Sequence, residues 1–343
     1  MLSIKLPVYI QRIYNVINPF YQPLIQHLET AAAPLKSQLR LAPPIIQALD
    51  LPDFKKHQVS VYLLRLDQIH PHVSGNKWYK LKYNLVQAVL NGASTLITFG
   101  GAWSNHLHAF SCMGRMLGMR TVAVLRGNEW QSQTNPMIED LKAWGTEIHC
   151  ISRQEYQCRN DSSYQQQWQH KYPGSYVIPE GGDNFWGVLG VSSLFSDLQQ
   201  ADQAVVRQMH SVAVACGTGN TLVGVRLALS AKQKVIGISA LKGEWYSDMI
   251  AQRMAAFWPL SLTNWQVFTQ YHGGGFGKLS TGIKSYMQEF ESASGVLLDP
   301  VYTAKLAYGI KQKINEGYFP PGHRLLLIHT GGLQGRRSLS KNT

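Results

Sequence analysis

Short runs of apolar and β-branched residues recur along this chain of 343 residues, and longer amphipathic stretches separate them. Most of the runs are almost continuously apolar, which is typical of parallel strands that are buried on both faces. Parallel strands also need a helical crossover between them, and the amphipathic stretches supply it. The pattern therefore predicts an α/β fold with parallel, twisted sheets flanked by helices. The expected strands are 61–66, 95–99, 121–125, 147–151, 176–178, 212–215, 235–239, 267–271 and 325–329.

Helices are expected between these strands, and one of them has clear boundaries. Asn135 is a favourable N-cap residue, Pro136 suits the first helical turn, and Gly145 is a typical helix terminator. The expected helices include 105–117, 136–144, 221–230, 281–292 and 302–314.

Residues 1–40 differ from the rest of the chain. They contain Pro7, Pro19 and Pro23 among several aromatic residues, and an alanine-rich stretch follows at 30–34. We expect a helical or irregular extension ahead of the main fold. The sequence leaves open whether this extension packs on the core or at a subunit contact.

The composition limits what the protein can be. Hydrophobic residues make up 45% of the chain and charged residues 15%, which indicates a globular protein with ample material for a core. No apolar run reaches the roughly 18 residues that a membrane span needs, and the first residues lack a clean signal-peptide core. We therefore expect a cytoplasmic protein with no membrane partner.

The net charge of +12 raises the alternative of a nucleic-acid-binding protein. The basic residues are dispersed, however, and no aromatic-basic RNA motif occurs, so we expect no nucleic-acid partner. The four cysteines form no C-x-x-C pair, and no H-E-x-x-H pattern is present. These observations argue against a metal site and against a disulfide framework.

A glycine-containing turn, Cys216-Gly217-Thr218-Gly219-Asn220-Thr221, joins the strand expected at 212–215 to a helix. Small residues allow backbone N–H groups to turn inward, and the start of a helix favours an anion. The turn therefore indicates a phosphate site, with the Thr218 and Thr221 hydroxyls as further donors. An ordinary glycine turn is the alternative, and the third glycine of a dinucleotide fingerprint is missing.

Another glycine-rich segment, His272–Leu279, resembles a nucleotide-binding P-loop only superficially. A P-loop needs a Ser or Thr directly after its lysine, and this chain has Leu279 after Lys278. The hydroxyl that would bind magnesium is therefore absent, which argues against a nucleotide hydrolase.

The segment Gly100-Gly101-Ala102-Trp103-Ser104-Asn105-His106 leads from an expected strand into a helix. We expect the N–H groups of Ser104, Asn105 and His106 to point out of the helix start, where a carboxylate is favoured. Ser104 is also a suitable N-cap, which would account for a serine here without any ligand. The paired glycines favour a ligand, because they let the backbone approach it closely.

Lys77 lies in Ser74-Gly75-Asn76-Lys77, with Lys80 and Lys82 as nearby competitors. A catalytic lysine needs a lowered pKa, which burial or a neighbouring cation can supply. An amine, a carboxylate site and a phosphate site are together what an enzyme needs to hold pyridoxal phosphate (PLP) as a Schiff base.

Taken in order, these segments resemble the 1-aminocyclopropane-1-carboxylate (ACC) deaminase / D-cysteine desulfhydrase family of PLP enzymes. The resemblance covers roughly residues 41–335. The matching segments are Gly75-Asn76-Lys77, Gly100-Gly101 with Ser104-Asn105-His106, Pro179-Glu180-Gly181-Gly182 with Gly187-Val188-Leu189-Gly190, Cys216-Gly217-Thr218-Gly219, Asp299–Lys305 and His329-Thr330-Gly331-Gly332.

The resemblance implies a role for each site residue. Lys77 is the Schiff-base lysine and the base that moves the Cα proton, and Ser104 is the catalytic serine. The implied substrate contacts are Ser104, Asn105, His106, the active-site tyrosine Tyr302, and Phe276. The implied cofactor contacts are Lys77, Asn105 at the 3′ oxygen, Thr303 beside the pyridine nitrogen, Cys216 and Thr330. The residues implied to hold the phosphate are Gly217, Thr218, Gly219, Asn220 and Thr221.

Two positions bear on the reaction. ACC deaminases have a glutamate where this chain has Thr303, and a carboxylate there makes a stronger electron sink than a hydroxyl does. Family members commonly have tyrosine near Phe276, so a hydroxyl that could act as acid or base is missing. The sequence therefore favours a D-cysteine desulfhydrase-like α,β-elimination on a small amino acid, giving pyruvate, ammonia and sulfide. ACC deamination and a non-catalytic PLP-binding protein are the alternatives.

The resemblance also implies a two-domain protein of fold type II, with the active site in the cleft between the domains. We expect a large PLP-binding domain of residues 41–78 and 190–343, and a small domain of residues 79–189 that carries Ser104. A homodimer is the expected assembly.

Overall fold

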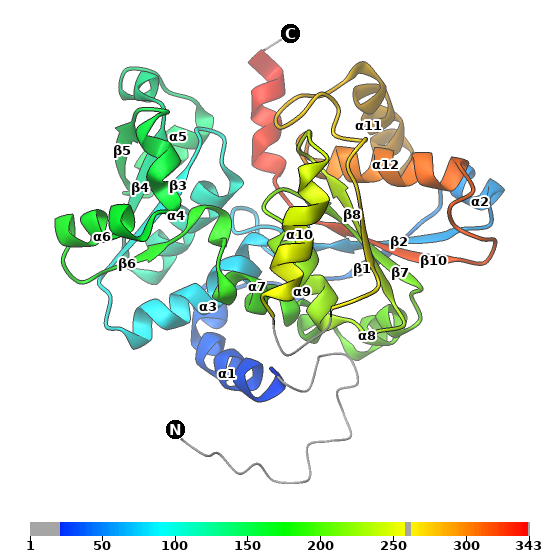
Figure 1. Ribbon diagram of the computed structural model, residues 1–343, viewed down its shortest axis with the longest axis horizontal. Helices are drawn as coiled ribbons and strands as arrows, with labels where there is room; N and C mark the ends of the chain where they lie inside the picture. The colour runs from blue at the N-terminus through cyan, green and yellow to red at the C-terminus, as the bar shows by residue number, and fades with distance from the viewer. Residues whose placement is uncertain (1–20, 258–261, 342–343) are drawn as a thin grey trace.

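Two separate sheets form the framework of the computed structural model, which describes residues 21–257 and 262–341 (Figure 1). The six-stranded sheet has the order β1-β2-β10-β7-β8-β9, and the four-stranded sheet has the order β5-β4-β3-β6. The strands of the first are β1 (Ile46–Leu49), β2 (Ser60–Arg65), β7 (Ser211–Cys216), β8 (Lys234–Ser239), β9 (Trp265–Phe268) and β10 (Arg324–His329). Those of the second are β3 (Thr95–Gly100), β4 (Arg120–Arg126), β5 (Glu147–Ile151) and β6 (Ser175–Ile178).

Helices surround both sheets, as Figure 1 shows. The α-helices are α1 (Gln22–Gln38), α2 (Pro52–Lys56), α3 (Lys77–Leu90), α4 (Asn105–Leu117), α5 (Pro136–Ala143), α6 (Ser162–Lys171), α7 (Phe185–Ser192), α8 (Gln200–Arg207), α9 (Asn220–Ala228), α10 (Trp245–Ala255), α11 (Thr281–Ser294) and α12 (Thr303–Asn315). Short 3-10 turns are η2 (Leu66–Gln68), η3 (Asn128–Gln131), η4 (Glu155–Asn160), η5 (Glu180–Gly182) and η6 (Leu194–Asp197), and η7 (Leu333–Lys341) follows the last strand.

The predicted α/β class with parallel sheets is confirmed, because all but one of the strand pairs among the described residues are parallel. The exception is β1, an antiparallel edge strand paired with β2 that the sequence did not reveal. The strand expected at 267–271 is instead Trp265–Phe268. The N-cap expected at Asn135 is confirmed, since its side chain accepts a hydrogen bond from the Ile138 N–H at 2.9 Å.

The central strand β7 explains why the strands read as continuous apolar runs. All six of its residues are buried. Val212 and Val214 enter the apolar cluster on one face of the sheet, and Ala213 and Ala215 enter the cluster on the other face. Both side-chain directions of the strand therefore avoid water, which removes the alternation of a half-exposed strand.

The N-terminal extension is helical from Gln22 onward, and it packs on the core. The helix α1 buries Ile25, Leu28 and Ala32. These side chains belong to one apolar cluster with Tyr83 and Val86 of α3 and Leu189 of α7. Residues 1–20 of the predicted extension lie outside the described residues. Within residues 21–257 and 262–341, no helix combines the length and the apolar character that a membrane span requires.

An ion pair between a buried lysine and a half-buried glutamate connects α1 to α3. The Lys82 ammonium, whose side chain is 1% exposed, contacts the Glu29 carboxylate and the Ser193 hydroxyl. The Tyr83 hydroxyl donates to the same carboxylate at 2.5 Å. Burial raises the pKa of Glu29, but the Lys82 charge and these hydrogen bonds outweigh burial, so the net pKa is lowered.

Replacing Glu29 tests this attachment. Glu29→Ala leaves a buried ammonium without its counter-charge, so we expect the free energy of unfolding in urea to fall by about 3 kcal/mol at pH 7. Asp50→Ala is the control, because the Asp50–Lys55 pair has side chains that are 73% and 69% exposed, and its loss costs less than about 1 kcal/mol. Because the pKa of Glu29 is lowered by folding, the difference from wild type should shrink as the pH falls below about 4. Equal losses in the two variants would contradict this account.

Candidate active site

Lys77 is the first residue of α3, and its amine is tied to the glycine turn through Asn76. The half-buried Lys77 Nζ donates to the Asn76 side-chain oxygen, and the Asn76 amide donates to Thr221 Oγ1 at 2.7 Å. Gly75 fixes the approach of this segment, because a Cβ there would lie 1.8 Å from the Thr330 carbonyl oxygen. The sequence thus places the lysine beside the ends of two neighbouring strands, β7 and β10.

The pKa of Lys77 is lowered to about 7. Burial is the main cause, because it disfavours the charged amine, and the nearby Lys80 charge acts in the same direction. The Asp299 carboxylate opposes the shift. A neutral amine is the nucleophilic form, so Lys77 is already reactive near neutral pH.

The glycine turn lies between β7 and α9, as predicted, although α9 begins at Asn220, one residue earlier than expected. Gly219 has φ +89°, and a Cβ there would lie 2.3 Å from Ile250 in α10. A Cβ on Gly217 would lie 3.0 Å from the Tyr302 ring, and the Gly217 carbonyl accepts from the Tyr246 hydroxyl at 2.7 Å. The backbone conformation and the close contact therefore require glycine at position 219, and the Tyr302 ring leaves little room for a side chain at position 217.

Lys80 is a residue of this site that the sequence offered only as a competitor to Lys77. It lies three residues later on α3, is 7% exposed, and its Nζ is 3.5 Å from Thr218 Oγ1. Burial lowers its pKa to about 8 despite the Asp183 carboxylate. Its ammonium adds a positive charge to the glycine turn. The sequence signal for this residue was its spacing, because Lys80 lies three residues after Lys77 and residues three apart on a helix are neighbours.

The side chain of Asn220 holds the turn in place. Its amide donates to the Gly182 carbonyl at 3.0 Å, and its oxygen accepts from Arg253 at 2.9 Å. Arg253 also forms a two-pronged ion pair with Asp183. These partners are distant in the chain, and no local pattern indicated them. Cys216 ends β7 as a buried thiol whose pKa burial raises to about 12, so it stays protonated.

The start of α4 carries Ser104 and Asn105, and the Asn105 side chain lies beside Gly332 after β10. The Ser104 hydroxyl caps the helix by accepting from the Leu107 N–H at 3.2 Å. Its own N–H donates to the Gly101 carbonyl at 2.9 Å, so this N–H does not point out of the helix start as expected. The Asn105 side-chain oxygen accepts from Gln334 at 2.6 Å.

His106 is buried rather than presented as a charged group. Its Nε2 lies 2.8 Å from the Thr98 hydroxyl, and its Nδ1 has no hydrogen-bond partner within the described residues. Burial and the charges of Lys77 and Lys80 lower its pKa to about 3. A neutral His106 offers no positive charge to a carboxylate, and Nδ1 is the atom left for a ligand.

Tyr302 precedes α12 and packs under the exposed Phe276. The ring centroids are 6.1 Å apart at an interplanar angle of 66°, and Phe276 is 56% exposed. Burial, followed by the Asp299 and Glu180 carboxylates, raises the pKa of Tyr302 above its ordinary value. The Tyr302 hydroxyl therefore keeps its proton and can act as a hydrogen-bond donor.

The Thr303 hydroxyl is hydrogen-bonded to the backbone of Asp299. The hydroxyl oxygen accepts from the Asp299 N–H at 2.6 Å and lies 3.2 Å from the Asp299 carbonyl, so the backbone satisfies it. The side chain is 2% exposed and lies beside apolar core residues such as Leu298 and Leu306. A contact with the pyridine nitrogen stays a prediction for Thr303. Thr330, at the end of β10 and 5% exposed, lies near Gly75 and Asn76.

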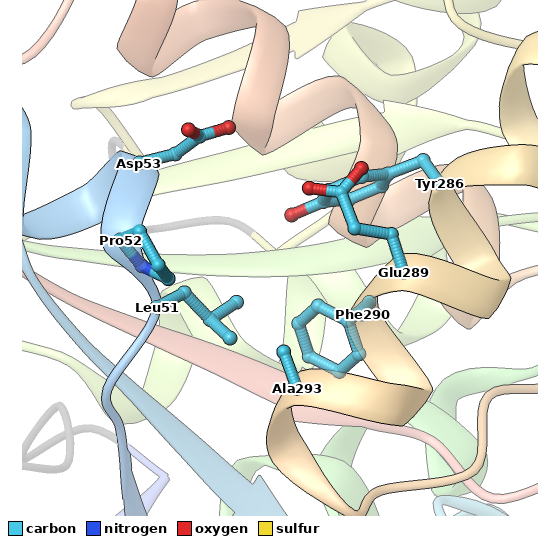
Figure 2. A pocket seen from close by; sticks show the side chains of 7 residues that line it. All are labelled: Leu51, Pro52, Asp53, Tyr286, Glu289, Phe290 and Ala293. Carbon is cyan, nitrogen blue, oxygen red and sulfur yellow. The ribbon is translucent and has the colours of Figure 1, made fainter.

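A shallow pocket elsewhere does not belong to this site. Figure 2 shows it between α2 and α11, where Asp53 and Glu289 flank an apolar floor. Lys311 lies 3.3 Å from each carboxylate. None of the predicted site residues lines the pocket.

The residues at the candidate site fit a phosphate-bearing aldehyde. Lys77 supplies an amine whose pKa is lowered to about 7, so that a large fraction is neutral near pH 7 and can condense with an aldehyde. The glycine turn at the start of α9, with the Lys80 ammonium and two threonine hydroxyls, is chemically suited to a phosphate. The buried Nδ1 of His106 supplies a further polar atom without a protein partner among the described residues.

Comparisons with known proteins agree with this chemistry. A model of the family described as pyridoxal-phosphate dependent enzyme matches residues 39–331. The chain is 29% identical to a Salmonella newport D-cysteine desulfhydrase, covering 79% of this chain and 86% of that protein. It is 28% identical to an Arabidopsis thaliana mitochondrial protein named bifunctional D-cysteine desulfhydrase/1-aminocyclopropane-1-carboxylate deaminase, covering 80% and 73%.

The fold is also similar to known structures. The crystal structure of an ACC deaminase homologue superposes with a TM-score of 0.75 at 26% identity, covering 91% of this chain and 98% of that one. A tomato (Solanum lycopersicum) threonine deaminase superposes with a TM-score of 0.64 at 14% identity, which shows the shared fold alone. With a matching family model over most of its length and a site that fits the coenzyme, the chain belongs to the pyridoxal-phosphate dependent enzyme family.

Proposed function

We propose that this enzyme is a lyase that catalyses α,β-elimination on a small amino acid, with D-cysteine or a β-substituted D-alanine as substrate. The observation that carries the proposal is the Lys77 amine, whose pKa is lowered to about 7 and which is linked through Asn76 to the glycine turn. Relatives named D-cysteine desulfhydrase support the substrate class. The products would be pyruvate and ammonia, together with sulfide when the substrate is D-cysteine.

Each group has a proposed task. PLP, when bound, withdraws electrons from the substrate and so makes its Cα proton acidic. The glycine turn and Lys80 hold the phosphate, and the Lys77 amine binds the coenzyme and later takes the Cα proton. The Asn105 amide and the Ser104 hydroxyl orient the substrate carboxylate or the coenzyme. Tyr302, which keeps its proton, donates a hydrogen bond next to the substrate.

Thr303 supports elimination over ring opening. Its hydroxyl carries no charge and is satisfied by the Asp299 backbone, so this position adds no carboxylate to the site. Opening a cyclopropane ring needs a stronger electron sink than expelling a thiol or chloride does. ACC deamination remains the alternative reaction, because the Arabidopsis relative carries both names. The cytoplasmic location stays a prediction from the composition. The domain limits 41–78 with 190–343 and 79–189, the cleft between the domains and the homodimer stay predictions from the resemblance.

Coenzyme attachment is tested by absorption spectroscopy of the purified protein supplied with PLP. We expect a band at ~410–420 nm in the wild type and its loss in Lys77→Ala, because the Lys77 amine has its pKa lowered to about 7 and is linked through Asn76 to the glycine turn. Lys311→Ala is the control, since Lys311 lies on α12 in ion pairs with Asp53 and Glu289, and it should keep the band. A Lys77→Ala protein that retains the band would contradict the assignment.

The reaction is tested with a panel of substrates. We expect pyruvate from D-cysteine and β-chloro-D-alanine, less from L-cysteine, and little 2-oxobutyrate from ACC. Turnover of ACC alone would overturn the argument from Thr303. A PLP-loaded protein that turns over none of these compounds would favour the non-catalytic PLP-binding alternative.

A further inference from the structure

The segment after the last strand reaches from the six-stranded sheet to the helices of the four-stranded one. Figure 1 shows η7 (red) between the two halves of the molecule. Its residue Gln334 lies three residues beyond the family match, which ends at 331. The Gln334 amide donates to the Trp103 carbonyl at 3.2 Å and to the Asn105 side-chain oxygen at 2.6 Å. Arg337, one turn later, lies 2.5 Å from the Asp140 carboxylate.

The orientation of the Gln334 amide follows from its neighbours. The Trp103 carbonyl can only accept a hydrogen bond, so the NH₂ group of Gln334 must face it. A guanidinium can only donate, and Arg337 donates to the Gln334 oxygen at 3.4 Å. With the amide reversed, the Gln334 oxygen would face the Trp103 carbonyl oxygen, and the Gln334 NH₂ group would face the Arg337 guanidinium. The NH₂ group of Gln334 is therefore fixed toward Asn105.

The orientation of Asn105 follows in turn. Asn105 must present its oxygen to Gln334, so its own NH₂ group points the other way. This group lies toward Gly332 and Asp299, because a Cβ on Gly332 would be 2.6 Å from Asn105 Nδ2 and 3.2 Å from Asp299 Cγ. Within residues 21–257 and 262–341, no hydrogen bond of Asn105 Nδ2 is present. The Asn105 NH₂ group is thus an oriented donor that no group of the described residues uses.

We propose that Gln334 is a positioning residue that fixes the amide of Asn105, so that its NH₂ group donates to an oxygen of the coenzyme or of the substrate carboxylate. This inference rests on the proposed function, which places Asn105 against these oxygens. Both candidate acceptors carry negative charge, and only the NH₂ end of an asparagine can serve them. Gln334 acts through Asn105 and does not itself touch the reacting atoms.

Two substitutions of Gln334 separate orientation from simple packing. Gln334→Glu has the same shape and keeps an acceptor for Arg337, but a carboxylate cannot donate, so it attracts the Asn105 NH₂ group and turns it away from the ligand. Gln334→Leu also loses both donated hydrogen bonds but attracts neither end of Asn105. We expect Gln334→Glu to be the more damaging variant, with a loss of about 10- to 100-fold, the range for a hydrogen bond to a charged group.

Two measurements tell the acceptors apart. If the coenzyme oxygen is the acceptor, PLP leaves the Gln334→Glu holoenzyme faster by that factor, which the decay of the absorption band reports. If the substrate carboxylate is the acceptor, KM rises by that factor and coenzyme release is unchanged. Adding Gln334→Glu to Asn105→Ala should change either quantity by less than about twofold, because the residue through which Gln334 acts is already gone.

The inference would be overturned by additive losses in the double variant, or by Gln334→Leu being as damaging as Gln334→Glu. Either result would mean that Gln334 only attaches η7 to α4. Unchanged KM and unchanged coenzyme release in Gln334→Glu would overturn it as well. A wild type that binds PLP but eliminates nothing would refute the proposed reaction. The measurement of coenzyme release needs no substrate, so it would still test the role of Gln334 in that case.

Discussion

The placement of one lysine amine in a half-buried position at the start of α3 is the constraint on which the rest of the site depends. Burial makes the charged form of Lys77 costly, and the Lys80 charge nearby adds to that cost, so the pKa falls to about 7. The amine keeps a hydrogen-bond partner in Asn76, and Asn76 in turn is held by Thr221. Burial and the Lys80 charge therefore set the pKa of the amine, and the hydrogen bonds through Asn76 direct it toward the glycine turn.

The fold supplies this placement by bringing the ends of parallel strands together. The turns after β7 and β10 lie at the carboxyl ends of neighbouring strands in one sheet, which is where ligand sites of α/β proteins form. The start of α4, after β3 of the other sheet, contributes Asn105. The η7 segment connects the two through Gln334 and Arg337, and α1 supports α3 from outside through the Glu29–Lys82 pair.

Much of this fold could be predicted from the sequence, because buried parallel strands carry unbroken apolar runs that are easy to recognise. Two of the elements that were not predicted illustrate the physical reasons. The strand β1 has only four residues, one of them buried, so its pattern is weak. The helix α3 buries Lys80, Lys82 and Asn84 along with its apolar residues, and polar residues on buried faces hide the helical periodicity.

The parts of the candidate site that are formed by residues close in the sequence could be predicted. The contacts between residues far apart in the sequence could not. The glycine turn and the Lys77 segment are short motifs whose chemistry can be read directly. The contact between Gln334 and Asn105 joins residues 229 positions apart, so no local pattern contains it. The directions of the His106 and Thr303 side chains depend on how their helices are rotated against the sheets, and this rotation is set by packing that a motif does not record.

The central claim, that the fold lowers the pKa of Lys77, is tested most directly by an NMR titration. The coenzyme-free protein would carry ¹⁵N-labelled lysine, and the Lys77→Ala variant would assign the signal. Our account predicts that this amine loses its proton near pH 7, far below the ordinary lysine value of about 10.4. A midpoint close to the ordinary value would contradict it, because the amine would then be solvated and charged at neutral pH.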